Sequence, residues 1–100
     1  MRLLLIEDDA QMADYLVKAM REAGHVIDHA ANGRDGLFMA SSENYDALIV
    51  DRLLPLMDGL AVIGVLRATG KQTPVMILSA LSDVDERIRG LRAGGDDYLV

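Results

Sequence analysis

The alternation of short apolar runs with stretches of helical periodicity is the feature that most constrains the fold of this chain. The apolar runs are short and are bounded by charged or turn-forming residues, which is typical of buried strands. The pattern predicts five strands, over residues 2–6, 25–30, 45–51, 73–80 and 96–100. Because strands that alternate with helices form a mainly parallel sheet, we predict a doubly wound α/β domain with helices on both faces.

Helical patterns occupy the segments between these strands. From Ala10 the apolar residues recur at steps of three and four, up to a C-terminal stop at Gly24. One face of this helix is predicted to contain Met12, Leu16, Ala19, Met20 and Ala23. After a turn at residues 32–33, further helices are predicted over residues 34–43, from Leu60 to near Gly70, and from Asp83 to residues 94–95. The strand over residues 25–30 contains polar residues, so we expect it at an edge of the sheet.

Composition narrows the class of protein. The chain has 100 residues, of which 51% are hydrophobic and only 4% aromatic, so it suffices for one domain with an aliphatic core. The absence of cysteine excludes disulfides and thiolate metal sites. A net charge of −6 argues against a nucleic-acid surface within this chain. We find neither a signal-peptide pattern nor an apolar run of the roughly 18 residues that span a membrane, and expect a cytoplasmic protein.

Polar residues follow three of the predicted strands, at the edge where doubly wound sheets bind their ligands. Glu7 and Asp8 follow the first strand, Asp51 ends the third, and Ser79 ends the apolar run of the fourth. If the first and third strands are neighbours, about 4.8 Å apart, their carboxylates can share one cation. An all-oxygen set of ligands favours Mg²⁺. Asp51 could then attack a phosphoryl group, and the Ser79 hydroxyl could donate to a phosphoryl oxygen.

Each of these residues also has an ordinary structural interpretation. The acidic residues 7–9 could form a solvated loop or a helix N-terminus, and a carboxylate after the third strand could begin a turn. Turn or cap roles alone would also explain Pro55, Asp58 and Gly59. His25 and His29 are expected to be edge-strand residues rather than metal ligands, because they pair with no cluster of ligand residues. The functional interpretation therefore depends on the three strand ends lying together.

The chain resembles the receiver domain of bacterial two-component response regulators. The resemblance covers the whole chain and lies in four motifs, which are LLLIEDD, YDALIVDRLLPLMDG, PVMILSA and AGGDDYLV. It implies a flavodoxin-like, five-stranded parallel sheet with strand order 2-1-3-4-5. It also implies that Mg²⁺ is the cofactor and that a histidine kinase supplies a phosphoryl group. Such a domain is a phosphorelay switch that takes part in its own phosphorylation and is not a turnover enzyme.

The resemblance implies a role for each residue of the acidic cluster. Asp51 corresponds to the phosphoacceptor. The Mg²⁺ ligands correspond to Asp8, Asp51 and the backbone carbonyl of Leu53, with Glu7 acting through a water molecule. Asp9 falls at the start of the first helix and outside the set of ligands.

Further residues correspond to the phosphate site and to a dimer surface. Ser79 matches the residue that holds the phosphoryl group, Ala80 the small residue that leaves room for it, and Tyr98 the aromatic switch residue. The motifs are most similar to those of the winged-helix transcription regulators of the OmpR/PhoB type. In that group the fourth helix, fifth strand and fifth helix form a dimer surface. The residues of that surface in this sequence are Arg87, Arg92, Asp96 and Asp97.

The family has a lysine and a fifth helix beyond the fifth strand, whereas this sequence ends at Val100. We therefore expect residues 1–100 to be a receiver domain that lacks its C-terminal helix and any output domain, and DNA to be contacted only through that absent domain. We also expect an apolar patch on the sheet face beside the first helix. Two other functions stay open, namely a Mg²⁺-dependent aspartyl phosphatase and a receiver-like interaction module.

Overall fold

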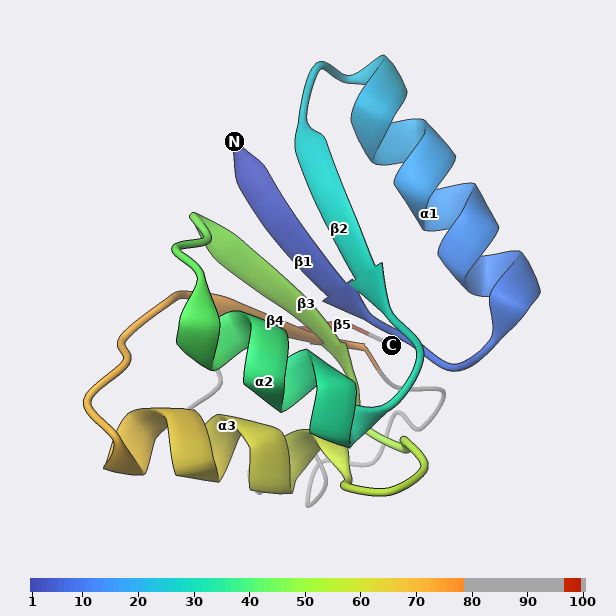
Figure 1. The fold of residues 1–100 in the computed structure, drawn as a ribbon. Coiled ribbons are helices and arrows are strands. Elements are labelled where there is room, and N and C mark those ends of the chain that lie inside the picture. The colour runs from blue at the N-terminus through green and yellow to red at the C-terminus, as the bar shows by residue number, and fades with distance from the viewer. Residues whose placement is uncertain (79–96, 100) are drawn as a thin grey trace.

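The computed structural model of the chain describes residues 1–78 and 97–99 (Figure 1). Its elements are β1 (Arg2–Ile6), α1 (Ala10–Glu22), β2 (Val26–Ala30), α2 (Gly33–Ser42), β3 (Ala47–Asp51), α3 (Gly59–Ala68), β4 (Val75–Leu78) and β5 (Asp97–Leu99). All strand pairs are parallel, and the sheet order is β2-β1-β3-β4-β5. The predicted doubly wound fold and the strand order are confirmed. The helix predicted after Asp83 lies outside the described residues.

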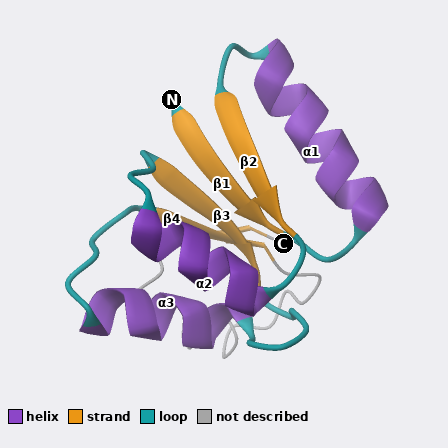
Figure 2. Cartoon of the chain, in the orientation of Figure 1, coloured by secondary structure: helices purple, strands orange, loops and turns teal. Residues whose placement is uncertain are grey.

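Helices cover both faces of the sheet, with α1 on one face and α2 and α3 on the other (Figure 2). Successive side chains of a strand point to opposite faces, so β1 contributes to two cores. Leu4 and Ile6 pack with the buried residues of α2 and α3. Leu3 and Leu5 pack with Ala13 of α1 and with inward-facing residues of β2 and β3. Strand β2 lies at the edge of the sheet, as its polar residues predicted.

The buried face of α1 differs from the predicted one. Met12 is 46% exposed and Ala23 is also exposed, although both were expected to face the core. The residues that pack against the sheet are Ala13, Leu16, Val17 and Met20. These four follow the i, i+3, i+4, i+7 spacing, whereas Met12 is rotated by one residue from that stripe. The prediction is confirmed for Leu16 and Met20 and wrong for Met12 and Ala23, because alanine is a weak marker of a buried face.

The segment at residues 32–33 is a helix start rather than the predicted turn. The Asn32 side chain accepts a hydrogen bond from the backbone N–H of Asp35 at 2.8 Å and so caps α2. Gly33 is the first residue of the helix, and a Cβ there would overlap the carbonyl of Met57. A glycine is therefore required by the close approach of the loop before α3, not by a turn.

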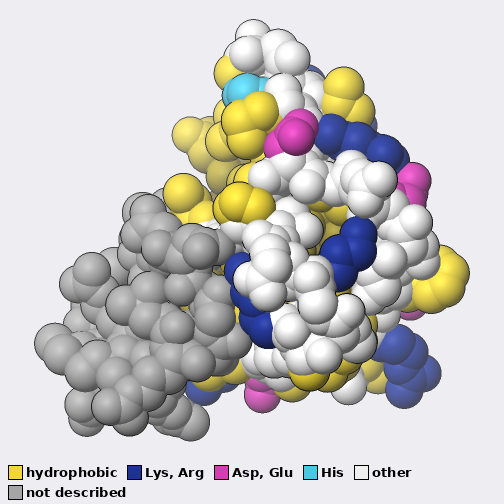
Figure 3. Space-filling model, turned by 90° about the vertical axis from the view of Figure 1, so that its left-hand side faces the viewer, with side chains coloured by type: hydrophobic (Ala, Val, Ile, Leu, Met, Phe, Trp, Pro, Cys, Tyr) yellow, Lys and Arg dark blue, Asp and Glu magenta, His cyan; other side chains and the backbone are white. Residues whose placement is uncertain are grey.

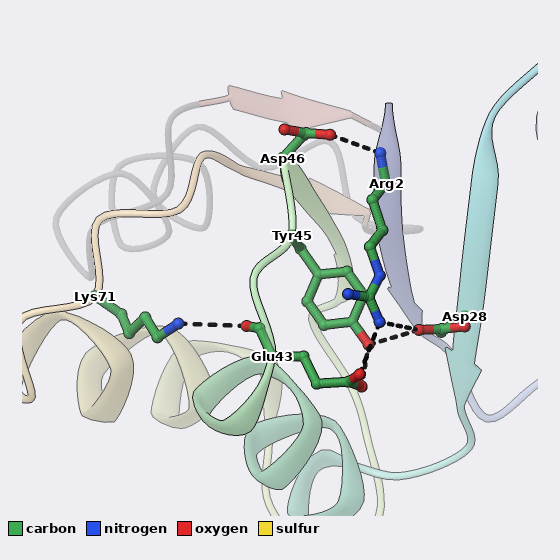
Figure 4. A network of polar contacts seen from close by, with 6 residues as sticks. All are labelled: Arg2, Asp28, Glu43, Tyr45, Asp46 and Lys71. Atoms are coloured by element: carbon green, nitrogen blue, oxygen red, sulfur yellow. Dashed lines mark hydrogen bonds and ion pairs between the residues drawn. The ribbon is translucent and has the colours of Figure 1, made fainter.

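A network of polar contacts ties together the amino-terminal ends of the strands (Figure 4). The hydroxyl of Tyr45 donates to Asp28 at 2.7 Å and to Glu43 at 3.1 Å. The guanidinium of Arg2 lies 4.9 Å from the centre of the Tyr45 ring and donates to Glu43 at 2.7 Å. Burial, and then these acidic partners, raise the pKa of the Tyr45 hydroxyl. The network links β1, β2 and the segment before β3, at the end of the sheet opposite to Asp51.

The sheet face beside α1 carries an apolar hollow of about 320 Å³, lined in part by Leu3, Met20, Ala47, Ile49 and Met76. This agrees with the apolar patch that the sequence predicted there. In Figure 3, hydrophobic side chains gather at the surface beside the grey atoms. Among the described residues, no helix has both the length and the apolar character needed to cross a bilayer.

Candidate metal and phosphoacceptor site

The register of the two central strands brings the predicted acidic residues together. Ile6 of β1 pairs with Val50 of β3, so the next residue of each strand, Glu7 and Asp51, reaches the same carboxyl-terminal edge. Asp8 follows directly in the loop before α1. One carboxylate oxygen of each of the three acidic residues lies within 4.8 Å of those of the other two. This is the clustering on which the functional interpretation depended.

Glu7 is the buried member of the cluster, with only 4% of its surface exposed. Its Oε1 accepts a hydrogen bond from the backbone N–H of Asp9 at 3.0 Å. Burial raises the pKa of Glu7 to about 7, against the opposing effect of the Asp9 amide and with help from a hydrogen bond to Asp51 and the charges of Asp51 and Asp8. The metal-free cluster therefore holds more negative charge than its surroundings favour.

Asp51 is half-buried, and α3 begins close behind it. Its Oδ1 accepts a hydrogen bond from the backbone N–H of Leu53 at 3.1 Å. Behind it, the backbone N–H of Gly59 donates to the carbonyl of Arg52 at 3.1 Å. A Cβ on Gly59 would overlap the carbonyl oxygen of Asp51 and lie 3.1 Å from Cγ1 of Val50. The glycine therefore allows α3 to begin directly against the strand that carries Asp51.

Two other acidic residues near the site are helix caps. The Asp9 carboxylate accepts hydrogen bonds from the backbone N–H groups of Gln11 at 2.9 Å and Met12 at 3.1 Å, and it caps α1. Asp58 accepts from the N–H of Ala61 at 2.9 Å and caps α3. The ordinary interpretation thus holds for Asp9 and Asp58. It does not explain Glu7, which is buried in the loop before the helix and faces Asp51.

Several predicted site residues lie outside the described part of the chain. These are Ser79, Ala80, Arg87, Arg92 and Asp96. Asp97 and Tyr98 belong to β5, which pairs with β4 on the far side from β3. The roles predicted for these residues stay predictions.

The sequence did not predict that His29 would contact the cluster. His29 lies in edge strand β2, as expected, and its Nε2 is 2.7 Å from the backbone carbonyl oxygen of Glu7. His25, at the other end of the same segment, lies far from the cluster, with its Nδ1 3.2 Å from the N-terminal amine. The only signal in the sequence was a histidine near the end of a strand next to the acidic one.

The donor set fits a hard cation. In the described part of the chain, the cluster offers carboxylate oxygens only, as Mg²⁺ prefers. Burial is the main cause of the raised pKa of Glu7, and a divalent cation would offset the charges of Asp51 and Asp8 that add to it. The half-buried Asp51 keeps a carboxylate at the surface edge, where a phosphoryl group from another molecule could reach it.

Comparisons with known proteins agree with this geometry. The family described as "Response regulator receiver domain" matches residues 3–100. Transcriptional regulatory protein HprR of Escherichia coli is 47% identical over 100 residues, which are all of this chain and 44% of HprR. The receiver domain of Francisella response regulator 1452 superposes with a TM-score of 0.95 at 36% identity, over 98% of this chain and 81% of that one. TrrA of Thermotoga maritima, solved in complex with Mg²⁺-BeF, gives a TM-score of 0.88 at 32% identity, over 99% of this chain and 84% of TrrA.

The chain spans less than half the length of the curated relatives it matches. Those relatives are transcriptional regulators of the OmpR/PhoB type, in agreement with the subfamily that the motifs indicated. With a match over nearly all of its residues, this chain belongs to the response regulator receiver domain family of two-component systems.

Proposed function

We propose that this domain is a phosphorylation switch that accepts a phosphoryl group on Asp51 from a histidine kinase, in a Mg²⁺-dependent reaction. The observation that carries the proposal is the convergence of Glu7, Asp8 and Asp51 at one edge of the sheet. The relatives support it, since HprR is a transcriptional regulatory protein and TrrA was solved with Mg²⁺-BeF.

The acidic cluster is the proposed Mg²⁺ site. Asp8, Asp51 and the backbone carbonyl of Leu53 would hold the ion, and Glu7 would act through a water molecule. Bound there, the ion would offset the charge of the carboxylates and of an incoming phosphoryl group. The raised pKa of Glu7, caused first by burial and then by Asp51 and Asp8, supports this assignment, because a buried carboxylate beside two others gains from a cation.

Asp51 is the proposed nucleophile. A carboxylate oxygen of Asp51 forms a P–O bond while the P–N bond of a phosphohistidine breaks, and the histidine leaves with that electron pair. The hydrogen bond from the Leu53 amide orients the carboxylate before the reaction. Ser79 is proposed to hold the new phosphoryl group through its hydroxyl, Ala80 to leave room for it, and Tyr98 to turn inward in response.

Phosphorylation is proposed to shift a two-state equilibrium toward a form that dimerises. The residues proposed for the dimer surface are Arg87, Arg92, Asp96 and Asp97. We infer that residues 1–100 act as the receiver domain of a cytoplasmic transcription regulator, in which a separate output domain binds DNA. The partners of the receiver domain would then be a histidine kinase and a second copy of itself.

The stoichiometry of phosphorylation distinguishes this function from the two alternatives. With Mg²⁺ and a small phosphodonor, we expect an acid-stable, base-labile adduct that approaches one phosphoryl group per chain. The adduct should be lost in Asp51→Asn and kept in Asp9→Asn, because Asp9 only caps α1. Continued release of phosphate from a phosphomonoester, in excess over protein, would instead indicate a phosphatase. Absence of any adduct would favour an interaction module.

A further inference from the structure

We propose that His29 is a positioning residue of the cation site: its ring holds the peptide that joins Glu7 to Asp8 and thereby sets the affinity for Mg²⁺. The proposal rests on the Mg²⁺ site proposed above and adds a residue from edge strand β2 to it. Its basis is the 2.7 Å contact between Nε2 of His29 and the carbonyl oxygen of Glu7.

The direction of this hydrogen bond follows from its acceptor. A carbonyl oxygen only accepts, so Nε2 of His29 carries the hydrogen and donates it. The carbonyl belongs to the peptide bond between Glu7 and Asp8. A restraint on this one group therefore acts on the orientation of both acidic residues.

His29 donates a hydrogen bond to the Glu7 carbonyl at the point where β2 no longer supplies a backbone N–H for it. Pairing between β1 and β2 ends at Ile6 and Ala30, and the backbone N–H of Glu7 makes one further bond, to the carbonyl of Ala30 at 3.0 Å. Beyond that point the chain turns toward Asn32, the cap of α2, so the ladder does not continue. The ring of His29 reaches across to the Glu7 carbonyl in its place.

Glu7 is consequently fixed through its backbone as well as its side chain. Its N–H and carbonyl are both tied to β2, and its Oε1 accepts from the Asp9 amide at 3.0 Å. Groups that hydrogen-bond to a metal-binding residue from behind affect metal affinity by about 10- to 100-fold when removed. We expect a loss near the lower end of that range for His29, because it acts on the backbone and not on a ligand atom.

Calorimetric titration with Mg²⁺ tests the proposal in four forms of the protein: wild type, His29→Ala, His29→Gln and His25→Ala. His29→Ala should weaken binding about tenfold. His29→Gln should stay within about threefold of wild type, because the glutamine amide can place an N–H near the position of Nε2. His25→Ala is the matched control, since His25 belongs to the same edge segment and contacts the N-terminal amine instead.

A second measurement, made without metal, reports on the segment from Glu7 to Asp9. Hydrogen exchange at the Asp9 amide, which donates to Glu7, should be faster in His29→Ala and restored in His29→Gln. Wild-type Mg²⁺ affinity in His29→Ala would overturn the role of His29 and leave the cation site intact. Mg²⁺ binding that is weakened equally in His29→Ala and His29→Gln would do the same. A wild-type protein that binds no Mg²⁺ would overturn the proposed cation site and this inference with it.

Discussion

Replacement of Glu7 by glutamine should stabilise the metal-free protein at alkaline pH. Glu7 is buried beside Asp8 and Asp51, and its pKa is raised from 4.5 to about 7. The folded protein therefore holds this proton more tightly than the unfolded chain does. The stability that protonated Glu7 contributes is fully present below pH 4.5 and is lost as the pH rises through about 7. Glutamine has no proton to lose, so the variant should lack this pH dependence.

The shift in pKa sets an upper limit of about 3 kcal/mol on the free energy of unfolding that wild type loses when Glu7 ionises. Asp8 is exposed, so solvent screens part of the repulsion, and we expect about 1–2 kcal/mol. The side-chain amide of Glu7→Gln could still donate to Asp51 and accept from the Asp9 amide, as the protonated acid does. At about pH 8, in EDTA, the variant should be more stable than wild type by that amount, and at about pH 5 the two should agree to within about 0.5 kcal/mol.

Urea unfolding followed by circular dichroism gives the required free energies for a small domain. Excess Mg²⁺ should remove the difference in free energy of unfolding between Glu7→Gln and wild type at about pH 8, because the cation stabilises wild type more than the variant. Glu22→Gln, an exposed carboxylate at the end of α1, is the matched control and should keep the wild-type dependence on pH. The electrostatic account of the cluster would be refuted if Glu7→Gln and wild type lost stability in parallel between these pH values.

Four further substitutions test how the fold supports the site. Gly59→Ala should destabilise the protein by about 2 kcal/mol or more in urea unfolding and lower phosphorylation of Asp51, because the new methyl meets backbone that cannot yield; Gly64→Ala, with nothing within 4 Å of its Cβ, should stabilise α3 by up to about 1 kcal/mol. Leu56→Gly should raise the melting temperature, by the equivalent of about 0.5–1 kcal/mol, because Leu56 has a φ of 69° and is exposed. Tyr45→Phe should lower the free energy of unfolding in urea by about 1 kcal/mol and leave Mg²⁺ affinity unchanged, since the Tyr45 hydroxyl bonds to acidic groups far from Asp51. A Mg²⁺ affinity lower than that of wild type would contradict the independence of this network from the cation site.

The sequence predicted the strands and the acidic edge well because those signals are local. The run before Glu7 is continuously apolar and ends in charge, and the observed β1 covers the predicted residues 2–6. The convergence of Glu7 with Asp51 followed once β1 and β3 were taken as neighbours, which the family resemblance supplied. Periodicity alone does not fix which strands are adjacent, because many strand orders satisfy the same alternation of elements.

What the sequence did not predict depends on contacts between distant segments. The bond from His29 to the Glu7 carbonyl exists because the β1–β2 register stops one residue earlier. The network around Tyr45 needs Asp28 from one strand and Arg2 from another. A helix face is ambiguous when small residues occupy it, which is why Met12 was wrongly assigned to the core of α1. Such features follow from packing, and no local pattern marks them.

The most direct test of the account is the fraction of Asp51 that carries a phosphoryl group, measured by mass spectrometry across a Mg²⁺ titration with a small phosphodonor. We predict that phosphorylation rises with Mg²⁺ occupancy, that it maps to Asp51, and that Asp8→Asn shifts the dependence to much higher Mg²⁺. Phosphorylation that is independent of Mg²⁺, that maps to another residue, or that is unchanged in Asp8→Asn would contradict it.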